Sequence, residues 1–197
     1  MPDSLLPARV VPLLCGRFGR DYLYVAACAS TQRLLRDDDP EGALAVTDHQ
    51  TEGRGRLGRS WTDAPGTSLL CSLLLRPPVP ADRLPQLTLV AAEACAEAIA
   101  RVTGLAPGVK EPNDVLVAGR KVAGLLGEAA AGRVVLGIGV NANQTTEDLP
   151  SGTRLPATSL RAELGSPVDR AALLAELLLR LEERYDAWVS EARAPAR

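Results

Sequence analysis

The sequence predicts one domain in which helices pack on a sheet that is at least partly antiparallel. Three β-like segments separated by turn residues follow one another between residues 115 and 140, and a long helical pattern lies on each side of them. The chain has 197 residues, of which 46% are apolar and 23% charged, so it is long enough for one well-packed domain and too short for two catalytic domains. No shift in composition and no internal repeat divides it.

The first part of the chain predicts three strands and one helix. Each strand is a short apolar run that ends at polar or helix-breaking residues, and the runs are 22–27, 43–49 and 68–75. Ser30 and Thr31 follow the first run and are residue types that cap helix N-termini, so a helix is expected from Gln32 onward.

Two long helices have the clearest patterns. The segment 82–102 is rich in alanine and leucine and ends before Gly104, a residue type that commonly follows a helix. Near the C-terminus, large apolar side chains fall on one stripe of an amphipathic helix that would pack on the sheet: Leu173, Leu174, Leu177, Leu178, Leu181, Tyr185 and Trp188.

Three further strands form a predicted antiparallel meander. They cover 115–117, 122–128 and 134–140, with Gly119-Arg120 and Ala131-Gly132 as the turns. The stretch 143–156 that follows contains prolines and a glycine among polar residues, so it is expected to be a surface connection.

Composition narrows the classes of function. The net charge of −2 gives the protein no overall field that would attract nucleic acid or anionic lipid. No apolar run reaches the roughly 18 residues of a membrane span and the N-terminus lacks a signal-peptide pattern, so we expect a cytoplasmic protein without membrane contact. One histidine, His49, and four widely spaced cysteines argue against a zinc centre and a Ser/His/Asp triad; the cysteines are expected to be buried, reduced thiols.

A loop rich in glycine and arginine follows the second predicted strand. It carries Arg54, Arg56 and Arg59 against one acid, Glu52, on a backbone whose glycines allow amide groups to approach a ligand. Such a loop suits a phosphate, but a mobile, solvated basic loop has the same composition. Trp61 directly after it favours a ligand site, because an exposed loop end seldom carries tryptophan without a surface or ring to cover.

Two more segments carry polar residues at strand ends. A hairpin over 114–121 would bring Asp114 and Lys121 together, as part of a site or as an ordinary surface salt bridge. In Gly137-Ile-Gly-Val-Asn141, glycines inside a strand indicate close approach of a ligand or backbone, or a bulge.

In their order and spacing these segments resemble the biotin protein ligase family, the biotin–[carboxylase] ligases. The resemblance runs from about Tyr22 to Asn143. The matching motifs are Ser30-Thr31, Gln50 with Gly53-Arg-Gly-Arg-Leu-Gly-Arg-Ser-Trp61, Lys110 with Pro112-Asn-Asp114, Gly119-Arg-Lys-Val-Ala-Gly124, and Gly137-Ile-Gly-Val-Asn141.

The resemblance implies an α+β catalytic domain with a mixed, largely antiparallel sheet, related to class II aminoacyl-tRNA synthetases and lipoate ligases. It also implies a two-step reaction that uses ATP and Mg²⁺. Biotin and ATP would give biotinyl-5′-AMP and pyrophosphate, and a lysine of a biotin carboxyl carrier protein, an acetyl-CoA carboxylase subunit or a similar protein, would then accept the biotinyl group. Since the biotin carboxylate is already ionised at pH 7, the first step needs cations rather than a general base.

Similarity also assigns roles to individual residues. Lys121 would bridge the biotin carboxylate and the α-phosphate together with Arg56, while Asp114 would hold Mg²⁺ and receive the proton of the acceptor lysine. Biotin would be bound by Ser30, Thr31, Gln32, Gln50, Gly53, Arg54 and Gly124. The nucleotide would be bound by Arg56, Trp61, Lys110, Asn113, Lys121 and Asn141.

The chain departs from the family pattern in several places. Glu111 stands where the family usually has tryptophan, and Gln32 where it favours asparagine. The segment before Tyr22 is shorter than a small domain of roughly 50 residues, so no helix-turn-helix domain and no DNA binding are expected. The chain ends soon after Trp188, so 1–197 is interpreted as the catalytic domain without the small C-terminal β-barrel of many members.

Three alternatives stay open at this stage. Glu111 and the absent barrel leave room for a non-catalytic binder of biotin or biotinyl-AMP, and the related folds allow transfer of lipoate. The sheet edges of such a domain also allow a homodimer.

Overall fold

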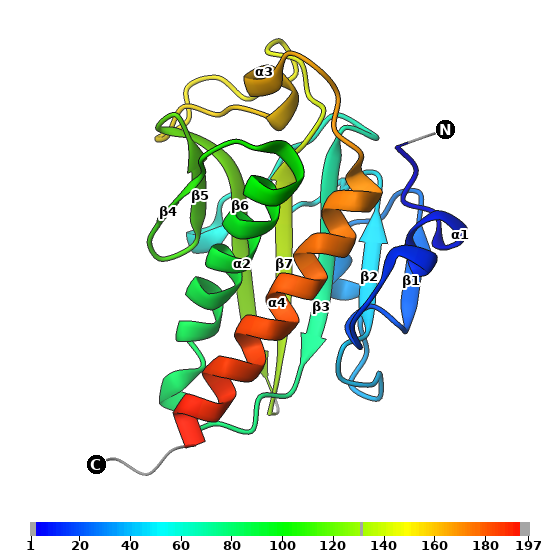
Figure 1. Cartoon of the computed structure of the whole chain (residues 1–197), viewed down its shortest axis with the longest axis vertical. Coiled ribbons are helices and arrows are strands. Elements are labelled where there is room, and N and C mark those ends of the chain that lie inside the picture. The colour runs from blue at the N-terminus through cyan, green and yellow to red at the C-terminus, as the bar shows by residue number, and fades with distance from the viewer. Residues whose placement is uncertain (1–2, 131, 194–197) are drawn as a thin grey trace.

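The computed structural model describes residues 3–130 and 132–193, and its centre is one seven-stranded sheet. The strand order is β1-β2-β3-β7-β6-β5-β4 (Figure 1). Only β1 and β2 run parallel; the other neighbours are antiparallel. The strands are β1 Tyr22–Val25, β2 Leu44–Thr47, β3 Ser68–Leu75, β4 Gly108–Lys110, β5 Asp114–Val117, β6 Arg120–Ala130 and β7 Arg133–Asn141. The prediction of a mixed, largely antiparallel sheet is confirmed.

Helices α2 (Gln86–Thr103) and α4 (Arg170–Arg193) pack side by side across one face of this sheet (Figure 1). Helix α2 ends at Gly104, which has the left-handed conformation that glycine adopts without strain. All seven members of the predicted C-terminal stripe are buried on α4. Both helix predictions are therefore confirmed, with α2 beginning a few residues later than expected.

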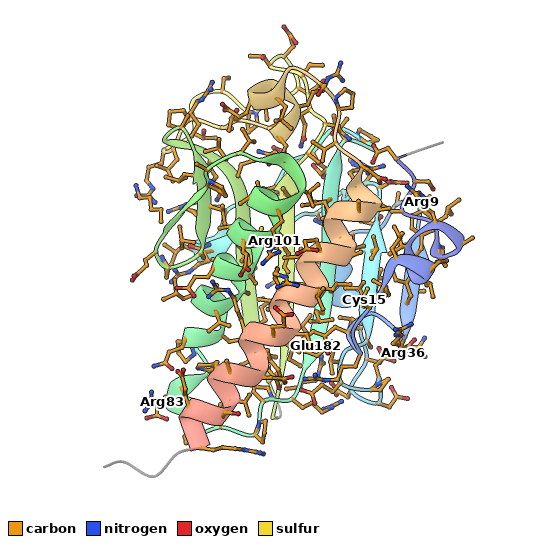
Figure 2. All side chains as sticks on the ribbon, viewed as in Figure 1. Arg9, Cys15, Arg36, Arg83, Arg101 and Glu182 are labelled. Carbon is orange, nitrogen blue, oxygen red and sulfur yellow. The ribbon has the colours of Figure 1, made fainter. Side chains whose placement is uncertain are left out.

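The N-terminal segment is fastened to α4 by a carboxylate. Glu182, labelled on α4 in Figure 2, accepts hydrogen bonds from the backbone N–H groups of Arg17 (2.7 Å) and Phe18 (2.9 Å). Phe18 itself is fully buried and meets Tyr185 of α4 edge to face, with ring centres 5.6 Å apart. Short helix α1 (Pro7–Val10) belongs to this segment.

The two faces of the sheet differ in what covers them. Along β7, Val134, Leu136, Ile138 and Val140 belong to the main core beneath the helices. Because side chains alternate along a strand, Gly137 and Gly139 lie on the opposite face. That face carries only a small second apolar cluster, so it has room for a cavity.

Three local predictions need correction, and a fourth falls partly outside the described residues. The residues after Ser30 form a single 3-10 turn, Thr31–Arg33, instead of a helix, because the Thr31 N–H and hydroxyl bond to distant side chains. The connection 143–156 is not wholly at the surface, since Asn143 and Gln144 are buried. Cys15 is exposed rather than buried. Of the predicted turn Ala131-Gly132, the first residue lies outside the described residues.

Three elements had no counterpart in the prediction: α1, strand β4 and the short helix α3 (Leu160–Leu164). Within residues 3–130 and 132–193, no helix combines the length and apolar character needed to cross a membrane.

Candidate active site

A cavity of about 580 Å³ lies on the face of the sheet away from α2 and α4. Eight separate stretches of chain contribute to its walls: 30–32, Gln50, 54–62, Cys71, 111–114, 121–126, 137–141 and 150–157. The sheet supplies the floor through β6 and β7, and the loops supply the sides.

The glycine- and arginine-rich loop is a small hairpin over 53–61. The Trp61 N–H donates to the Gly53 carbonyl (2.8 Å), and the Gly55 N–H donates to the Arg59 carbonyl (2.7 Å). A Cβ atom at residue 53 would overlap the Trp61 carbonyl oxygen, so the close approach of the two arms requires glycine there. The backbone thus sets the position of the side chains between these residues.

Trp61 lies on the floor of the cavity. A Cβ atom at Gly139 would come within 2.8 Å of Trp61 Cε2, and one at Gly124 within 3.1 Å of Trp61 Cζ3. The ring therefore needs both glycines beneath it. The Trp61 Nε1–H is buried and has no hydrogen-bond partner among the described residues.

Lys121 and Asp114 form an ion pair in the wall of the cavity. Their Nζ and Oδ1 atoms are 2.5 Å apart, and the side chains are 28% and 10% exposed. A register shift between Val115 and Leu116 places Lys121, rather than Val122, opposite Leu116. The ammonium group also lies 5.7 Å from the centre of the Trp61 ring, within the range of a cation–π contact. The hairpin predicted to bring Asp114 and Lys121 together is confirmed.

The backbone of Lys121 is fixed by a segment from the far end of the chain. Its N–H donates to the Pro156 carbonyl (2.8 Å), and its carbonyl accepts from the Thr158 N–H (2.9 Å). Asn141 joins the same segment by donating from Nδ2 to the Thr158 carbonyl (2.9 Å). The position of Lys121 is therefore set by β5, β6 and residues 156–158 together.

Polar side chains line a second part of the cavity. Thr31 donates its N–H to Gln50 Oε1 (2.8 Å), and its hydroxyl shares a hydrogen bond with Ser72 (2.7 Å). Gln32 donates to the Leu126 carbonyl (3.1 Å) and packs beneath Gly137, where a Cβ atom would come within 3.1 Å of its Cδ. These groups suit a ligand that carries its own donors and acceptors.

The three arginines of the hairpin differ in their partners. Arg54 forms a two-pronged ion pair with Glu128 of β6. Arg56 has only a 3.5 Å hydrogen bond to Asn113 Oδ1, and among the described residues neither Arg56 nor Arg59 has a carboxylate partner. Two guanidinium groups thus remain available to an anion.

No thiol of the cavity is a nucleophile at neutral pH. Cys71 of β3 borders the cavity, and complete burial of its side chain raises the pKa of the thiol to about 12. The thiol is therefore protonated, whereas the thiolate is the reactive form.

Residues 25–144 match the model of the biotin/lipoate A/B protein ligase family. The chain belongs to this family. It is 38% identical over 186 residues to the bifunctional ligase/repressor BirA of Bacillus spizizenii, covering 90% of this chain and 57% of BirA. It is 37% identical to the biotin–[acetyl-CoA-carboxylase] ligase of Mycobacterium tuberculosis, over 76% of this chain and 56% of that enzyme.

Solved structures agree with this family assignment. The biotin protein ligase of Aquifex aeolicus in complex with biotin and ATP superposes with a TM-score of 0.78 at 33% identity, over 86% of this chain and 72% of that one. The present family member spans little more than half the length of the two curated relatives described above.

Most residues that the resemblance singles out meet in this one cavity of the family member. Its lining includes Ser30, Thr31, Gln32, Gln50, Arg54, Arg56, Trp61, Asn113, Asp114, Lys121, Gly124 and Asn141. Two others do not line it: Lys110 is exposed on β4, and Gly53 is buried against Trp61. Glu111 is exposed at the rim.

Sequence reasoning missed one wall of the cavity. Pro150, Thr153, Arg154 and Leu155 line it, although their segment was predicted to be a surface connection. The segment has no periodic pattern, so the only signal was an arginine among prolines and small polar residues.

Asp114 is the one predicted metal ligand. The described part of the chain contains no cluster of three or more His, Cys, Asp or Glu side chains that could hold a metal ion. Mg²⁺ is commonly bound through one or two carboxylates together with substrate phosphates and water. The donor set thus fits a Mg²⁺ ion that arrives with a nucleotide, with Asp114 as its protein ligand.

Proposed function

We propose that the chain is an ATP-dependent biotin protein ligase. It forms biotinyl-5′-AMP from biotin and ATP, and it then transfers biotin to a lysine of a biotin carboxyl carrier protein, such as the carrier subunit of acetyl-CoA carboxylase. The biotin ligase activity of its relatives supports this proposal, as does the chemistry of the cavity.

The first step needs positive charge more than it needs a base. An oxygen of the biotin carboxylate attacks the α-phosphorus, and the bond to the departing pyrophosphate breaks. No proton moves, because a carboxylic acid is already ionised near pH 7. Cations must bring two anions together and stabilise the charge that develops on the phosphoryl oxygens.

Lys121 and Arg56 meet this requirement from two different segments. Lys121 is fixed by three elements of the sheet and its flank, and Arg56 extends from the hairpin toward Asn113. Placed between them, the biotin carboxylate and α-phosphate would exchange the Asp114 contact of Lys121 for substrate oxygens. This convergence of cations at one end of a polar cavity is the observation that carries the proposal.

The remaining lining groups divide between the two substrates. The polar pocket of Ser30, Thr31 and Gln50 would orient the ureido ring of biotin, with the glycines of β6 and β7 against its flat side. Trp61 would stack on adenine, and Asn113 and Asn141 would lie near the nucleotide. The hairpin would exclude water from the mixed anhydride.

In the second step, the neutral amine of the acceptor lysine attacks the biotinyl carbonyl and AMP leaves. We assign the proton of that amine to Asp114, whose carboxylate is released when Lys121 turns to the substrate phosphate. Mg²⁺ bound by Asp114 and the phosphates would shield their charge during adenylate formation.

One assay tests the proposal. Purified protein is incubated with Mg-ATP, biotin and a carrier domain, and both pyrophosphate and streptavidin-reactive carrier are measured. Labelled carrier with an equivalent amount of pyrophosphate supports ligation. Biotin binding without release of pyrophosphate would contradict the proposal. Labelling of the carrier with lipoate in place of biotin would show that lipoate is the substrate.

A non-catalytic binder of biotinyl-AMP is the second candidate. It is favoured by Glu111, a carboxylate at the cavity rim that would repel nucleotide phosphate. Glu111→Gln separates the two: a restored reaction in this variant, with none in the parent, supports the binder.

A further inference from the structure

The hairpin 53–61 is joined to the sheet by one ion pair. Arg54 Nη1 donates to Glu128 Oε2 at 3.0 Å, and Arg54 Nη2 donates to Oε1 of the same carboxylate. Both nitrogens of the fork are engaged, which is the strongest geometry for an arginine–carboxylate pair. The two residues are 74 positions apart in the sequence, so the contact is a tertiary tie.

Glu128 lies on the same face of the sheet as the floor of the cavity. In strand β6, Gly124, Leu126 and Glu128 are spaced by two residues and therefore point to one side. Gly124 and Leu126 line the cavity. Glu128 thus lies on the same strand and the same face as Gly124, which contacts the Trp61 ring.

The ion pair and the tryptophan secure opposite arms of the hairpin. Arg54 and Ser60 pair across it, and Trp61 follows Ser60 directly. One arm is held by Glu128, and the other by the contact of the indole with Gly124 and Gly139. If the ion pair breaks, the arm that carries Arg54 loses its tie to β6, and only the Trp61 arm still contacts the sheet.

The ion pair with Glu128 also distinguishes Arg54 from Arg56. Its fork is filled by a carboxylate of the chain itself, whereas Arg56 has no carboxylate partner among the described residues. A substrate anion at Arg54 would have to displace Glu128, and one at Arg56 would displace only an amide contact. The geometry therefore fits a structural role for Arg54.

We propose that Glu128 is a positioning residue that latches the hairpin closed over the cavity through Arg54. One part of this proposal rests on the proposed function: the latch slows the escape of biotinyl-AMP. The closed position of the hairpin itself does not depend on which ligand the cavity takes.

The latch can be measured with Trp61 as the reporter. The chain has two tryptophans, so Trp188→Phe leaves Trp61 as the single source of indole emission. In that background we expect Glu128→Gln to raise acrylamide quenching of Trp61 and trypsin cleavage between Arg56 and Leu57 by roughly two- to fivefold, the range of a partly exposed ion pair. The melting temperature should stay nearly unchanged, which separates a latch from general destabilisation.

A neighbouring ion pair provides the matched control. Arg33 and Glu52 pair at 2.7 Å at the base of the hairpin, are more exposed than Arg54 and Glu128, and do not lie on β6. Glu52→Gln should leave quenching and cleavage at the parent values. The exchanged pair Arg54→Glu with Glu128→Arg should return both toward the parent values.

The latch is overturned if Glu128→Gln leaves quenching and cleavage unchanged or if Glu52→Gln has the same effect. Dissociation of biotinyl-AMP, followed by chase with unlabelled biotin and ATP, should be two- to fivefold faster in Glu128→Gln. Slower dissociation would overturn the proposal, because it would show Glu128 competing with the ligand for Arg54. Failure to form any adenylate in the parent would reject the proposed function alone, while the quenching and cleavage results would still decide the latch.

Discussion

The Lys121 ammonium group is paired with the Asp114 carboxylate at 2.5 Å in the wall of the cavity, and the lysine is the more exposed partner. The arrangement keeps a cation at a fixed point without leaving it uncompensated. A substrate carboxylate or phosphate that approaches from the cavity can replace Asp114 as the partner of Lys121. The same exchange would free Asp114 for a metal ion or for the proton of the acceptor amine.

Replacement of Lys121 by alanine is expected to lower the rate of adenylate formation by roughly 10²–10³-fold, the effect of removing one group that stabilises transition-state charge. Biotin-dependent exchange of pyrophosphate into ATP measures this step without the carrier. A rate within a few-fold of the parent would remove Lys121 from the mechanism.

That variant leaves the mostly buried Asp114 carboxylate without its cation, so it also loses stability. The double variant Lys121→Met with Asp114→Asn is the control, since it removes both charges. It should melt closer to the parent and still lack exchange activity. Recovery of activity along with stability would mean that the single variant failed through its fold.

Arg56→Gly tests the cation at the tip of the hairpin. We expect biotinyl-AMP to leave this variant about ten times faster, because a charge-assisted hydrogen bond is worth about 1.5–3 kcal/mol. Arg36→Gly removes an exposed arginine that does not line the cavity and should leave the dissociation rate unchanged. Equal rates in parent and Arg56→Gly would show that Arg56 does not touch the intermediate.

Gly139→Ala tests the floor beneath Trp61. The added methyl group would come within 2.8 Å of the indole, closer than such atoms approach, so the ring must move. We expect weaker nucleotide binding and a red-shifted Trp61 emission in the Trp188→Phe background. Gly108→Ala, on strand β4 with open space around the new Cβ, is the matched control. An unchanged Trp61 spectrum in Gly139→Ala would mean that the ring does not rest there in solution.

The sequence predicted the elements whose local pattern agrees with their final environment. The stripe of α4 is apolar at the positions that face the core, and the strands β5 to β7 alternate with turn residues between them. The helix expected after Ser30 failed because Gln50 and Ser72, both distant in sequence, bind Thr31 and hold the chain in a single turn. Propensity favoured a helix and a tertiary contact overrode it.

In the candidate site, too, the sequence predicted what local structure fixes and missed what tertiary contacts fix. Lys121 and Asp114 could be placed together because a short hairpin fixes their separation. The wall at 150–157 could not be predicted, because backbone hydrogen bonds between Lys121 and residues 156 and 158 hold it at the cavity, and such bonds leave no trace in side-chain type. Lys110 was assigned to the nucleotide by its motif, yet strand β4, three residues long, carries it outside the cavity lining.

The four cysteines should differ strongly in reactivity toward a thiol reagent at pH 8. Burial raises the pKa of Cys71 and of Cys95 to about 12 and raises that of Cys28 above its ordinary value, while Cys15 is exposed (Figure 2). A raised thiol pKa means less thiolate at pH 8, and the thiolate is the form that reacts.

Native protein should therefore show one fast thiol, a second slower one, and two that react only in denaturant. Cys15→Ser should remove the fast phase alone, and the unfolded parent should titrate four thiols. Peptide mapping of the labelled protein identifies each site. Rapid labelling of Cys71 in the native state would contradict the burial of its side chain, and with it the placement of β3 at the centre of the sheet.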